Sequence, residues 1–469
     1  MPPAPYDTII IGAGMSGLAA GIRLAQYDQR VLILERHYLW GGLNSFYKQS
    51  GRRFDVGLHA LTNFVPKGKR GTPLGKLLRQ LRLRHDDLQL AEQSHSEIAF
   101  PDVKLRFSND FELLRSEVAA AFPSERAHFD ELRRIVDDYD AFQPPDTEIG
   151  AREVLADILH DPLLIELLLV PLCFYGSARE HDVDWYQFVI LFRSLFEEGF
   201  ARPEGGIKPL LDLLVARYAE LGGELRMRSG VERILHEGGR CQGVVLDDGT
   251  EILADRVLSS AGWAETLQLA GDDLSRRHVD PGEQGQLSFT ETICVLDDEP
   301  ANLGSDATII FFNDAEHFEY ARPMGLTDPR SGVICLPNNY SSASPLPEGL
   351  LRLTTLANYD CWRDLEGQAY EEAKVIEADA ALDVAARYAF DPRPHEVYRD
   401  SFTPLTVERF TGKRGGAVYG ANKKRLDGCT PLENLHLIGT DQGLLGVTGS
   451  MLSGISIANR YALQPHSKA

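Results

Sequence analysis

The chain has 469 residues, of which 43% are hydrophobic and 25% are charged. This is the composition of a folded globular protein, and it excludes a disordered, collagen-like or disulfide-stapled chain. The 69 acidic residues outweigh 48 basic ones and give a formal net charge of −21, which argues against a nucleic-acid-binding role.

The cysteines and the first residues bear on where the protein works. Six cysteines occur without metal-ligand or redox-motif spacing, which predicts reduced thiols in a cytoplasmic protein. Residues 1–7 lack the basic and apolar segments that are typical of a signal peptide, so we expect none. No run of about 18 apolar residues occurs, so we expect no membrane-spanning segment. Peripheral contact with the inner face of a membrane stays open.

The first strong pattern is a strand, a glycine turn, a helix and a second strand. Residues 8–11 form a β-branched run, typical of a strand buried on both faces. A GxGxxG turn at residues 12–17 follows, then a helical stretch at 18–25 and a second apolar run at 31–34 that ends on Glu35. This order predicts a dinucleotide-binding unit, with the diphosphate at the helix N-terminus and the ribose on the acid.

A second glycine pattern follows six residues after the acid. The glycine pair in residues 41–45 allows the backbone to lie against a flat or phosphorylated group. Residues 51–59 then form a hairpin-like segment with an acidic turn that ends at His59. Together these residues resemble the FAD-binding region of the glutathione-reductase-like flavoproteins. The glycine pair resembles the second motif of the amine oxidase and phytoene desaturase superfamily.

The chain then leaves the nucleotide unit and returns to it. Helical patterns occupy the next section, at residues 74–83, 111–122, 129–139 and 161–176. A Pro-Glu-Gly-Gly segment at 203–206 precedes a helix at 210–221, a hairpin at 243–251 and a strand at 256–261. In the resembled family this order rebuilds the nucleotide sheet and places Val231 beside the adenine.

Residues 263–425 alternate short strands with loops, around one long helix at 370–388. The expected strands are 289–296, 308–312, 332–336 and 350–355. This pattern predicts a mixed sheet that forms the floor of a substrate domain. Residues 403–410 together with 415–420 resemble the carotenoid isomerase and retinol saturase branch.

The C-terminal segment carries the second strong pattern. A buried strand at 435–438 leads into a glycine-rich turn at 439–449 and a small-residue helix at 450–461. In the resembled family this segment closes over the flavin, and the helix N-terminus stabilises negative charge on the reduced ring. The acid follows glycine after one intervening residue, Gly439-Thr440-Asp441, rather than directly. This departure leaves open whether Asp441 meets the ribityl chain.

The resemblance implies an α/β fold with a glutathione-reductase-like (Rossmann-type) FAD-binding domain interleaved with a mixed-sheet α+β substrate domain. The FAD-binding parts are expected at residues 1–62, 201–262 and 426–469. The substrate parts are expected at residues 63–200, which also face a membrane, and 263–425. The residues assigned to FAD are Gly12, Gly14, Ser16, Gly17, Glu35, Arg36, Gly41, Gly42, Leu43, Asn44, Val231, Gly439, Asp441, Gly446, Val447 and Thr448.

Two surface questions remain open at this point. Residues 163–175 and 188–196 are almost continuously apolar and form either core, a hydrocarbon tunnel mouth or a face that dips into a membrane. Residues 67–84 contain seven Lys or Arg and no acid. They form either a solvated helix face or a surface attracted to anionic lipid head groups.

The chemistry follows from the cofactor, which exchanges a hydride with carbon. Amine oxidases hold a neutral amine in an aromatic cage built partly from the C-terminal segment, and residues 439–449 contain no aromatic side chain. The resemblance therefore implies an FAD-dependent oxidoreductase that desaturates, saturates or isomerises a long isoprenoid or polyene. The catalytic candidates are His59, then Tyr419 and Arg409, and no metal-binding pattern is found. The alternatives are an amine or amino-acid oxidase and a non-catalytic protein that binds flavin and lipid.

Overall fold

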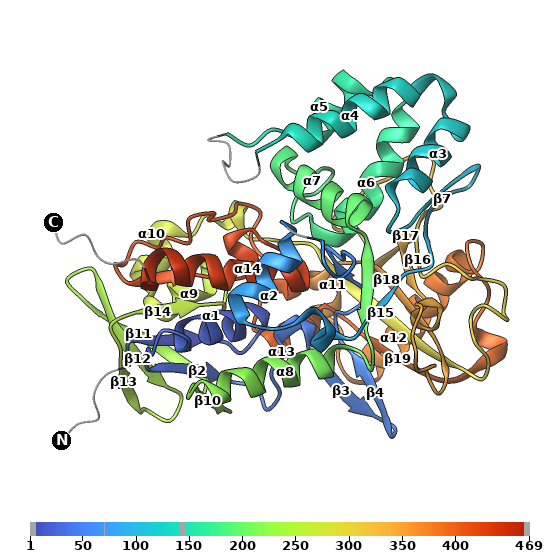
Figure 1. The fold of residues 1–469 in the computed structure, drawn as a ribbon. Coiled ribbons are helices and arrows are strands. Elements are labelled where there is room, and N and C mark those ends of the chain that lie inside the picture. The colour runs from blue at the N-terminus through green and yellow to red at the C-terminus, as the bar shows by residue number, and fades with distance from the viewer. Residues whose placement is uncertain (1–5, 70, 141–146, 464–469) are drawn as a thin grey trace.

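The structure is a computed structural model that describes residues 6–69, 71–140 and 147–463. The segment Met1–Pro5 and Arg70, which entered the sequence analysis, lie outside the described residues. In Figure 1 a sheet with its helices lies on the left, a larger sheet lies on the right, and a group of helices covers the top. The functional site is built where these three parts meet.

A five-stranded parallel sheet forms the left part. Its order is β10-β2-β1-β14-β20, with bounds Glu224–Met227, Val31–Glu35, Thr8–Ile11, Val257–Ser259 and Leu435–Leu437. Ile10 of the central strand pairs with Ile33 on one side and Leu258 on the other. All four residues of β1 are buried, as expected of a strand covered on both faces. Three stretches that are far apart in sequence thus meet in one sheet.

Helices cover both faces of this sheet. They are α1 (Met15–Ala25), α2 (Pro73–Leu81), α8 (Ile207–Glu220), α9 (Trp263–Ala270), α10 (Asp272–His278) and α14 (Gly446–Ala458). Helix α14 packs closely on α1, because Gly454 has no side chain: a Cβ there would lie 2.0 Å from the carbonyl oxygen of Ser16. The sequence placed this last helix at 450–461, so its start is corrected to Gly446.

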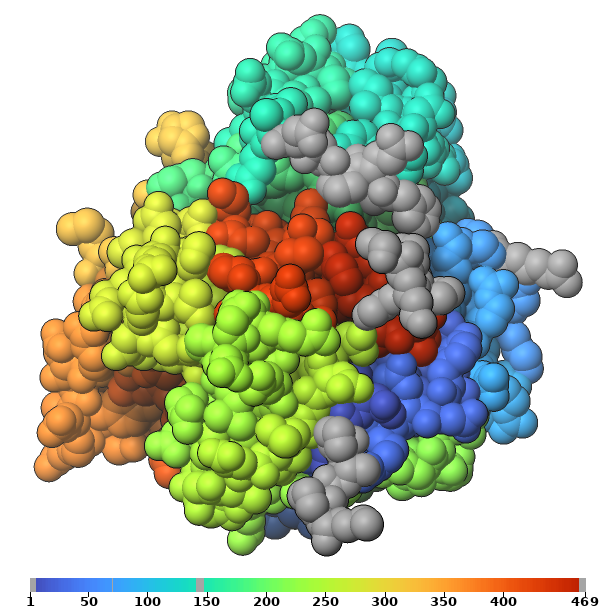
Figure 2. Space-filling view, turned by 90° about the vertical axis from the view of Figure 1, so that its left-hand side faces the viewer, coloured from blue at the N-terminus to red at the C-terminus, as the bar shows by residue number. Residues whose placement is uncertain are grey.

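A small antiparallel sheet stands beside the parallel one. It contains β11 (Val231–Glu237), β12 (Arg240–Leu246) and β13 (Glu251–Leu253). Figure 2 shows this green unit at the bottom, with the red C-terminal residues between it and the helical layer above. Val231 opens β11, so this sheet reaches the nucleotide-binding region through its first residue.

The right-hand sheet has seven strands in the order β19-β15-β18-β17-β16-β7-β8. Their bounds are Glu396–Phe402, Ser288–Leu296, Gly349–Ala357, Thr327–Cys335, Ile309–Asn313, Ser96–Phe100 and Val103–Phe107. The β16–β7 pair is parallel and the other pairs are antiparallel, so the sheet is mixed as expected. The long helix α12 (Gly367–Ala385) and the short helices α11 (Tyr359–Arg363) and α13 (Pro404–Thr411) flank it.

Short strands join these parts. The pair β3–β4 spans Phe46–Gln49 and Arg52–Asp55. A three-stranded sheet has the order β5-β9-β6, with bounds Leu61–Thr62, Phe200–Pro203 and Leu90–Glu92. Strand β9 therefore brings the end of the helical layer back to the segment that follows His59.

The helical layer at the top of Figure 1 contains the apolar segments 163–175 and 188–196. Its helices are α3 (Phe111–Ala121), α4 (Arg126–Asp138), α5 (Ala151–Ile158), α6 (Pro162–Gly176) and α7 (Trp185–Phe192). Most apolar side chains of α6 and α7 are buried in one cluster with strands β7, β8 and β16. For these buried side chains, this supports the core interpretation over that of a face that dips into a membrane. Within the described residues, no helix combines the length and apolar content needed to cross a bilayer.

Candidate functional site

One cavity of about 1050 Å³ runs between the parallel sheet, the mixed sheet and the helical layer. One end is lined by the carboxyl ends of β1 and β2 and by the glycine turns. The other end is lined by apolar side chains of α6, α7 and β15. In open α/β sheets, ligands bind outside the carboxyl ends of the strands, so the first end is the expected nucleotide site.

The turn between β1 and α1 gives its three glycines different roles. Gly12 has φ +98, and a Cβ there would lie 2.2 Å from Ser260 Oγ. A Cβ on Gly17 would lie 2.0 Å from the carbonyl oxygen of Gly12, so Gly17 lets the helix pack against its own turn. Gly14 alone has no atom within 4 Å of an added Cβ, although its backbone is extended at φ −74. Because Gly14 has no side chain, the part of the cavity next to it is open.

Glu35 joins this turn to the second glycine pattern. Its Oε2 accepts the Ala13 N–H at 2.8 Å and its Oε1 accepts the His37 N–H at 2.9 Å. The Gly41 N–H in turn donates to the Ala13 carbonyl at 2.9 Å. The first turn, the acid and the glycine pair are thus fixed to one another by backbone donors. Both oxygens of the acid retain acceptor capacity toward the cavity that the residue lines.

The N-terminus of α14 opens on the same cavity. Gly446 and Val447 line it, and no side chain caps the helix. Helix α1 likewise begins at the cavity without a side-chain cap. Two helix N-termini with free N–H groups and positive dipole ends therefore face one volume, which favours an anionic or electron-rich ligand.

Asp441 does not line this cavity. Its Oδ1 accepts the Ala421 N–H at 2.9 Å, and its Oδ2 accepts the Trp263 N–H at 2.6 Å. Lys413 Nζ lies 3.2 Å from Oδ2. Burial opposes ionisation of Asp441, but Lys413 outweighs it and holds the pKa of the carboxyl at about 2. The residue therefore braces two loops, and its assignment to the cofactor is corrected. The one-residue shift after Gly439 is the reason.

Lys413 is a residue that the sequence analysis missed. It lines the cavity and is 7% exposed. Burial disfavours its charge, but the carboxylates of Asp441 and Glu265 raise its pKa. Lys413 is thus a buried cation in the cavity wall, paired with Asp441. The signal available in the sequence was a basic pair, Lys413-Arg414, set between glycines in an acidic chain.

His59 lies on the cavity wall within a buried polar cluster. Its Nε2 lies 3.2 Å from Glu291 Oε2 and 3.2 Å from Thr354 Oγ1. Glu291 also pairs with Arg352, which is 2% exposed. Burial opposes the Glu291 charge, but Arg352 outweighs it and holds the pKa of Glu291 at about 2. Burial lowers the pKa of His59 despite Glu291, so its imidazole is neutral at pH 7.

Two buried arginines hold the segment Val56–His59. Arg352 donates to the carbonyls of Val56 at 2.6 Å and Leu58 at 2.9 Å. Arg202 donates to Leu58 at 2.7 Å and to His59 at 3.1 Å. Its Nη2 also contacts Asp55 at 2.5 Å. The backbone that carries His59 is therefore fixed from both sides, which is the arrangement that a precisely placed side chain needs.

The far end of the cavity is apolar. Its lining side chains are Phe174, Tyr175, Ile190, Leu191, Phe289, Val333, Val418, Tyr419, Leu444 and Leu445. The hydroxyl of Tyr419 donates to the Phe174 carbonyl, and burial raises its pKa well above the ordinary value. Tyr419 is thus a wall residue with its proton engaged. Only a few side chains of α6 and α7 reach this wall, and the tunnel interpretation of the apolar segments stays a prediction for them.

Most residues assigned from the sequence meet at this cavity. Those that line it are Gly12, Gly14, Ser16, Glu35, Arg36, Gly41, Gly42, Leu43, Asn44, His59, Val231, Tyr419, Gly439, Gly446 and Val447. Gly17 and Thr448 do not line it: the first packs under the turn, and the second donates to the Thr62 carbonyl at 3.2 Å. Arg409 is exposed outside the cavity, where its carbonyl accepts from Arg36, so its catalytic assignment is corrected.

The nucleotide end fits a flavin dinucleotide. It offers an open glycine turn, an acid with acceptor capacity, two uncapped helix N-termini and a buried lysine along one continuous wall. Gln442 also lines the wall, and its buried Oε1 has no partner among the described residues. Such a buried acceptor is satisfied by a hydroxyl-bearing ligand.

Comparison with known proteins agrees with this geometry. Residues 15–460 match the family of flavin-containing amine oxidoreductases. Prolycopene isomerase 2 of an Oncidium hybrid cultivar is 23% identical over 97% of this chain and 84% of its own length. All-trans-retinol 13,14-reductase of Danio rerio is 23% identical over 98% of this chain and 87% of its own. The crystal structure of an oxidoreductase from Methanosarcina mazei is similar in fold, with a TM-score of 0.65 at 17% identity, covering 97% of this chain and 100% of its own.

Proposed function

The chain belongs to the family of flavin-containing amine oxidoreductases, and we propose that it exchanges a hydride between the flavin and a long polyene. The family match and the fold confirm three expectations from the sequence: the FAD cofactor, the class of oxidoreductase and the α/β architecture. FAD supplies a ring that takes a hydride from carbon or returns one. The protein supplies position, polarity and exclusion of water.

The observation that carries this proposal is that no carboxylate without a cationic partner lines the apolar end of the cavity, among the described residues. Among the described residues, three acids line it: Glu35, Glu265 and Glu291. Glu35 is bound to the first turn, Glu265 accepts the Arg414 N–H at 3.0 Å, and Glu291 pairs with Arg352. A charged ammonium substrate would be paired with a carboxylate, whereas the apolar wall suits a hydrocarbon.

We assign the FAD contacts along the wall in order. The turn at Gly12, Gly14 and Ser16 receives the diphosphate, with Lys413 as its buried cation. Glu35 binds the ribose hydroxyls next to the adenine. The N-terminus of α14 at Gly446 would support the electron-rich ring, and Gly41 and Gly42, which line the same cavity, would help to hold the cofactor.

His59 is the proposed proton-transfer group. Glu291 is ionised and accepts only, so the proton of the neutral imidazole resides on Nε2. The lone pair is then on Nδ1, which has no partner among the described residues. When a hydride leaves one carbon of a polyene, the proton of the neighbouring carbon passes to Nδ1. In saturation the same atom returns it, so the electrons and protons balance in either direction.

The names of the relatives support the substrate class. A prolycopene isomerase and an all-trans-retinol reductase act, by their names, on polyenes, and each aligns over almost all of this chain. Desaturation and saturation change the number of double bonds, whereas isomerisation leaves it unchanged and requires reduced flavin. The shared requirement is an extended apolar chain beside the flavin.

Peripheral contact with an anionic membrane is proposed as the route of substrate delivery. Helix α2 buries Leu77 and Leu78 and exposes Lys76 and Arg79, and Arg82, directly after the helix, is also exposed. Lys76 also lines the cavity. Anionic lipid attracts such a face by about 1 kcal/mol per basic residue near the surface. Flotation with phosphatidylserine vesicles is expected to carry the protein at low salt and to release it at high salt. Equal flotation with neutral vesicles would contradict an electrostatic contact.

Product analysis tests the proposal. The FAD-loaded protein is incubated with phytoene, with a cis-polyene or with a primary amine, under oxidising and reducing conditions, and the polyenes are separated by chromatography. We expect a polyene of altered double-bond number or geometry and no hydrogen peroxide from the amine. Peroxide release from an amine, with every polyene unchanged, would establish the amine oxidase alternative. Loss of all product in the His59→Gln protein would assign the proton step.

A further inference from the structure

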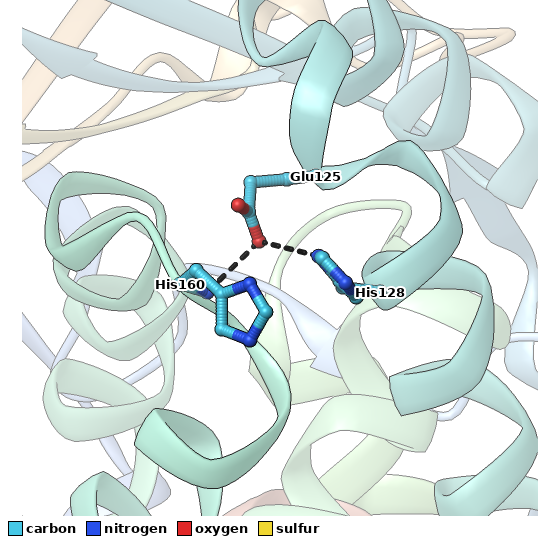
Figure 3. A group of neighbouring side chains, drawn as sticks. All are labelled: Glu125, His128 and His160. Atoms are coloured by element: carbon cyan, nitrogen blue, oxygen red, sulfur yellow. Dashed lines mark hydrogen bonds and ion pairs between the residues drawn. The ribbon is translucent and has the colours of Figure 1, made fainter.

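A second cluster lies in the helical layer, away from the cavity. Glu125 ends a short turn (Pro123–Glu125), His128 lies in the first turn of α4, and His160 lies between α5 and α6. Figure 3 shows the two imidazole rings on either side of the carboxylate. One ligand atom from each residue lies within 4.8 Å of the others. The third residue is distant in sequence, so spacing alone did not reveal the group.

Glu125 is a buried carboxyl group with few polar partners. Its side chain is 4% exposed, and the one side-chain partner among the described residues is His128, whose Nδ1 lies 3.3 Å from Oε2. The His160 backbone N–H donates to the same oxygen at 3.0 Å. An ionised carboxylate out of water requires a paired positive charge or a metal. Within the described part of the chain, Glu125 therefore lacks a full positive partner, and it lies among side chains that can bind a metal.

We propose that Glu125, His128 and His160 form a zinc site that ties α4 to the α5–α6 connection. Two imidazoles and a carboxylate are typical zinc ligands, and two nitrogen ligands disfavour Mg²⁺ and Ca²⁺. Tetrahedral zinc with bonds of about 2.0–2.1 Å separates its ligand atoms by about 3.4 Å, which the Glu125–His128 pair already matches. The exposed His160 ring closes the remainder by a small rotation, and water takes the fourth position.

The site has a structural purpose in this fold. Helix α6 begins two residues after His160 and ends in Phe174, Tyr175 and Gly176, the first two of which line the cavity. The rings of His128 and His160 already lie 4.2 Å apart, centroid to centroid, at 63°. Zinc here fixes the start of the helix whose end forms the apolar wall. Its loss is expected to loosen the helical layer without removing FAD.

Zinc binding by the full FAD-loaded protein tests the proposal. Metal is first removed by chelator treatment and dialysis. Titration calorimetry with Zn²⁺ is then expected to give one equivalent, and elemental analysis of the zinc-loaded protein after dialysis is expected to give the same stoichiometry. His128→Gln, His160→Gln and Glu125→Gln are each expected to weaken binding at least about 100-fold, since even outer-shell partners contribute 10–100-fold. His317→Gln, an exposed histidine outside the cluster, is the matched control and is expected to bind as wild type does.

Thermal unfolding gives a second readout. Zinc is expected to raise the midpoint of the wild-type and His317→Gln proteins, and to leave that of His160→Gln unchanged. The flavin spectrum and the metal-free midpoint show whether each variant is folded, and the exposed His160 is the substitution least able to disturb the fold. No zinc uptake by wild type, in both calorimetry and elemental analysis, would show that the cluster is held by its hydrogen bonds alone. Equal zinc uptake by wild type and His160→Gln would show adventitious metal only. Either result overturns the proposal.

Discussion

The ion pair under His59 gives the sharpest prediction about the fold. Arg352→Met removes the guanidinium that neutralises Glu291 and also removes the donors to Val56 and Leu58. Leu58 keeps its bond from Arg202, but the carboxylate of Glu291 is left buried and unpaired. Breaking a buried pair in this way costs about 3–5 kcal/mol in unfolding free energy at neutral pH.

The ionisation of Glu291 determines in which direction the stability of each protein changes with pH. In wild type the pKa of Glu291 is about 2, so the carboxylate stabilises the fold above pH 4.5, and this contribution is lost as the pH falls toward 2. In the variant, burial acts without Arg352 and raises this pKa above the ordinary value. Lowering the pH from the raised pKa to about 4.5 protonates Glu291 and recovers about 1.4 kcal/mol per pH unit relative to wild type.

Urea unfolding followed by tryptophan fluorescence between pH 8 and 5 measures both quantities. The matched control is Arg52→Met, which breaks a partly exposed arginine–glutamate pair and is expected to cost at most about 1 kcal/mol at every pH. Adding Glu291→Gln to Arg352→Met is expected to remove the pH dependence and recover stability. The account of Glu291 as a buried charge is refuted if the variant shows the same pH profile as wild type.

Three further predictions concern the site. Gly14→Ala fills open space, so we expect FAD binding to weaken by at least about 10-fold while the stability of the FAD-free protein is unchanged. Gly17→Ala collides with the backbone and lowers the stability of the protein itself. Fluorescence titration measures the first effect and thermal melting the second. His59→Gln is expected to slow turnover by about 10²–10⁴-fold with FAD still bound, and a loss below 10-fold would exclude general base catalysis. Steady-state rates of Tyr419→Phe and Arg409→Ala are expected to fall less than 10-fold. The Tyr419 hydroxyl is bonded to the Phe174 carbonyl in the cavity wall, and Arg409 lies outside the cavity.

Sequence reasoning succeeded where the chemistry is local. The glycine turn at 12–17 and Glu35 belong to one contiguous βαβ unit, so their spacing determines their geometry. The C-terminal turn was recognised in the same way. Asp441, which follows Gly439 after one intervening residue, does not line the cavity, and its carboxylate points toward Lys413. Linear patterns do not report the direction of a side chain after such a shift.

The polar cluster under His59 was out of reach for a different reason. Glu291 and Arg352 lie on the neighbouring strands β15 and β18, and His59 lies on a loop far upstream. Only the register of the mixed sheet and the arginine contacts to residues 56–59 bring them together. Arg409 failed for the converse reason, because a motif shared with relatives placed it near the site without fixing its direction.

Hydride exchange between the flavin and a polyene is tested most directly by the anaerobic visible spectrum of the FAD-loaded protein. We expect the oxidised flavin bands to bleach on addition of phytoene, or the photochemically reduced protein to saturate or isomerise an added polyene. Bands that persist with every polyene in both redox states, yet bleach with a primary amine or amino acid, would contradict the account.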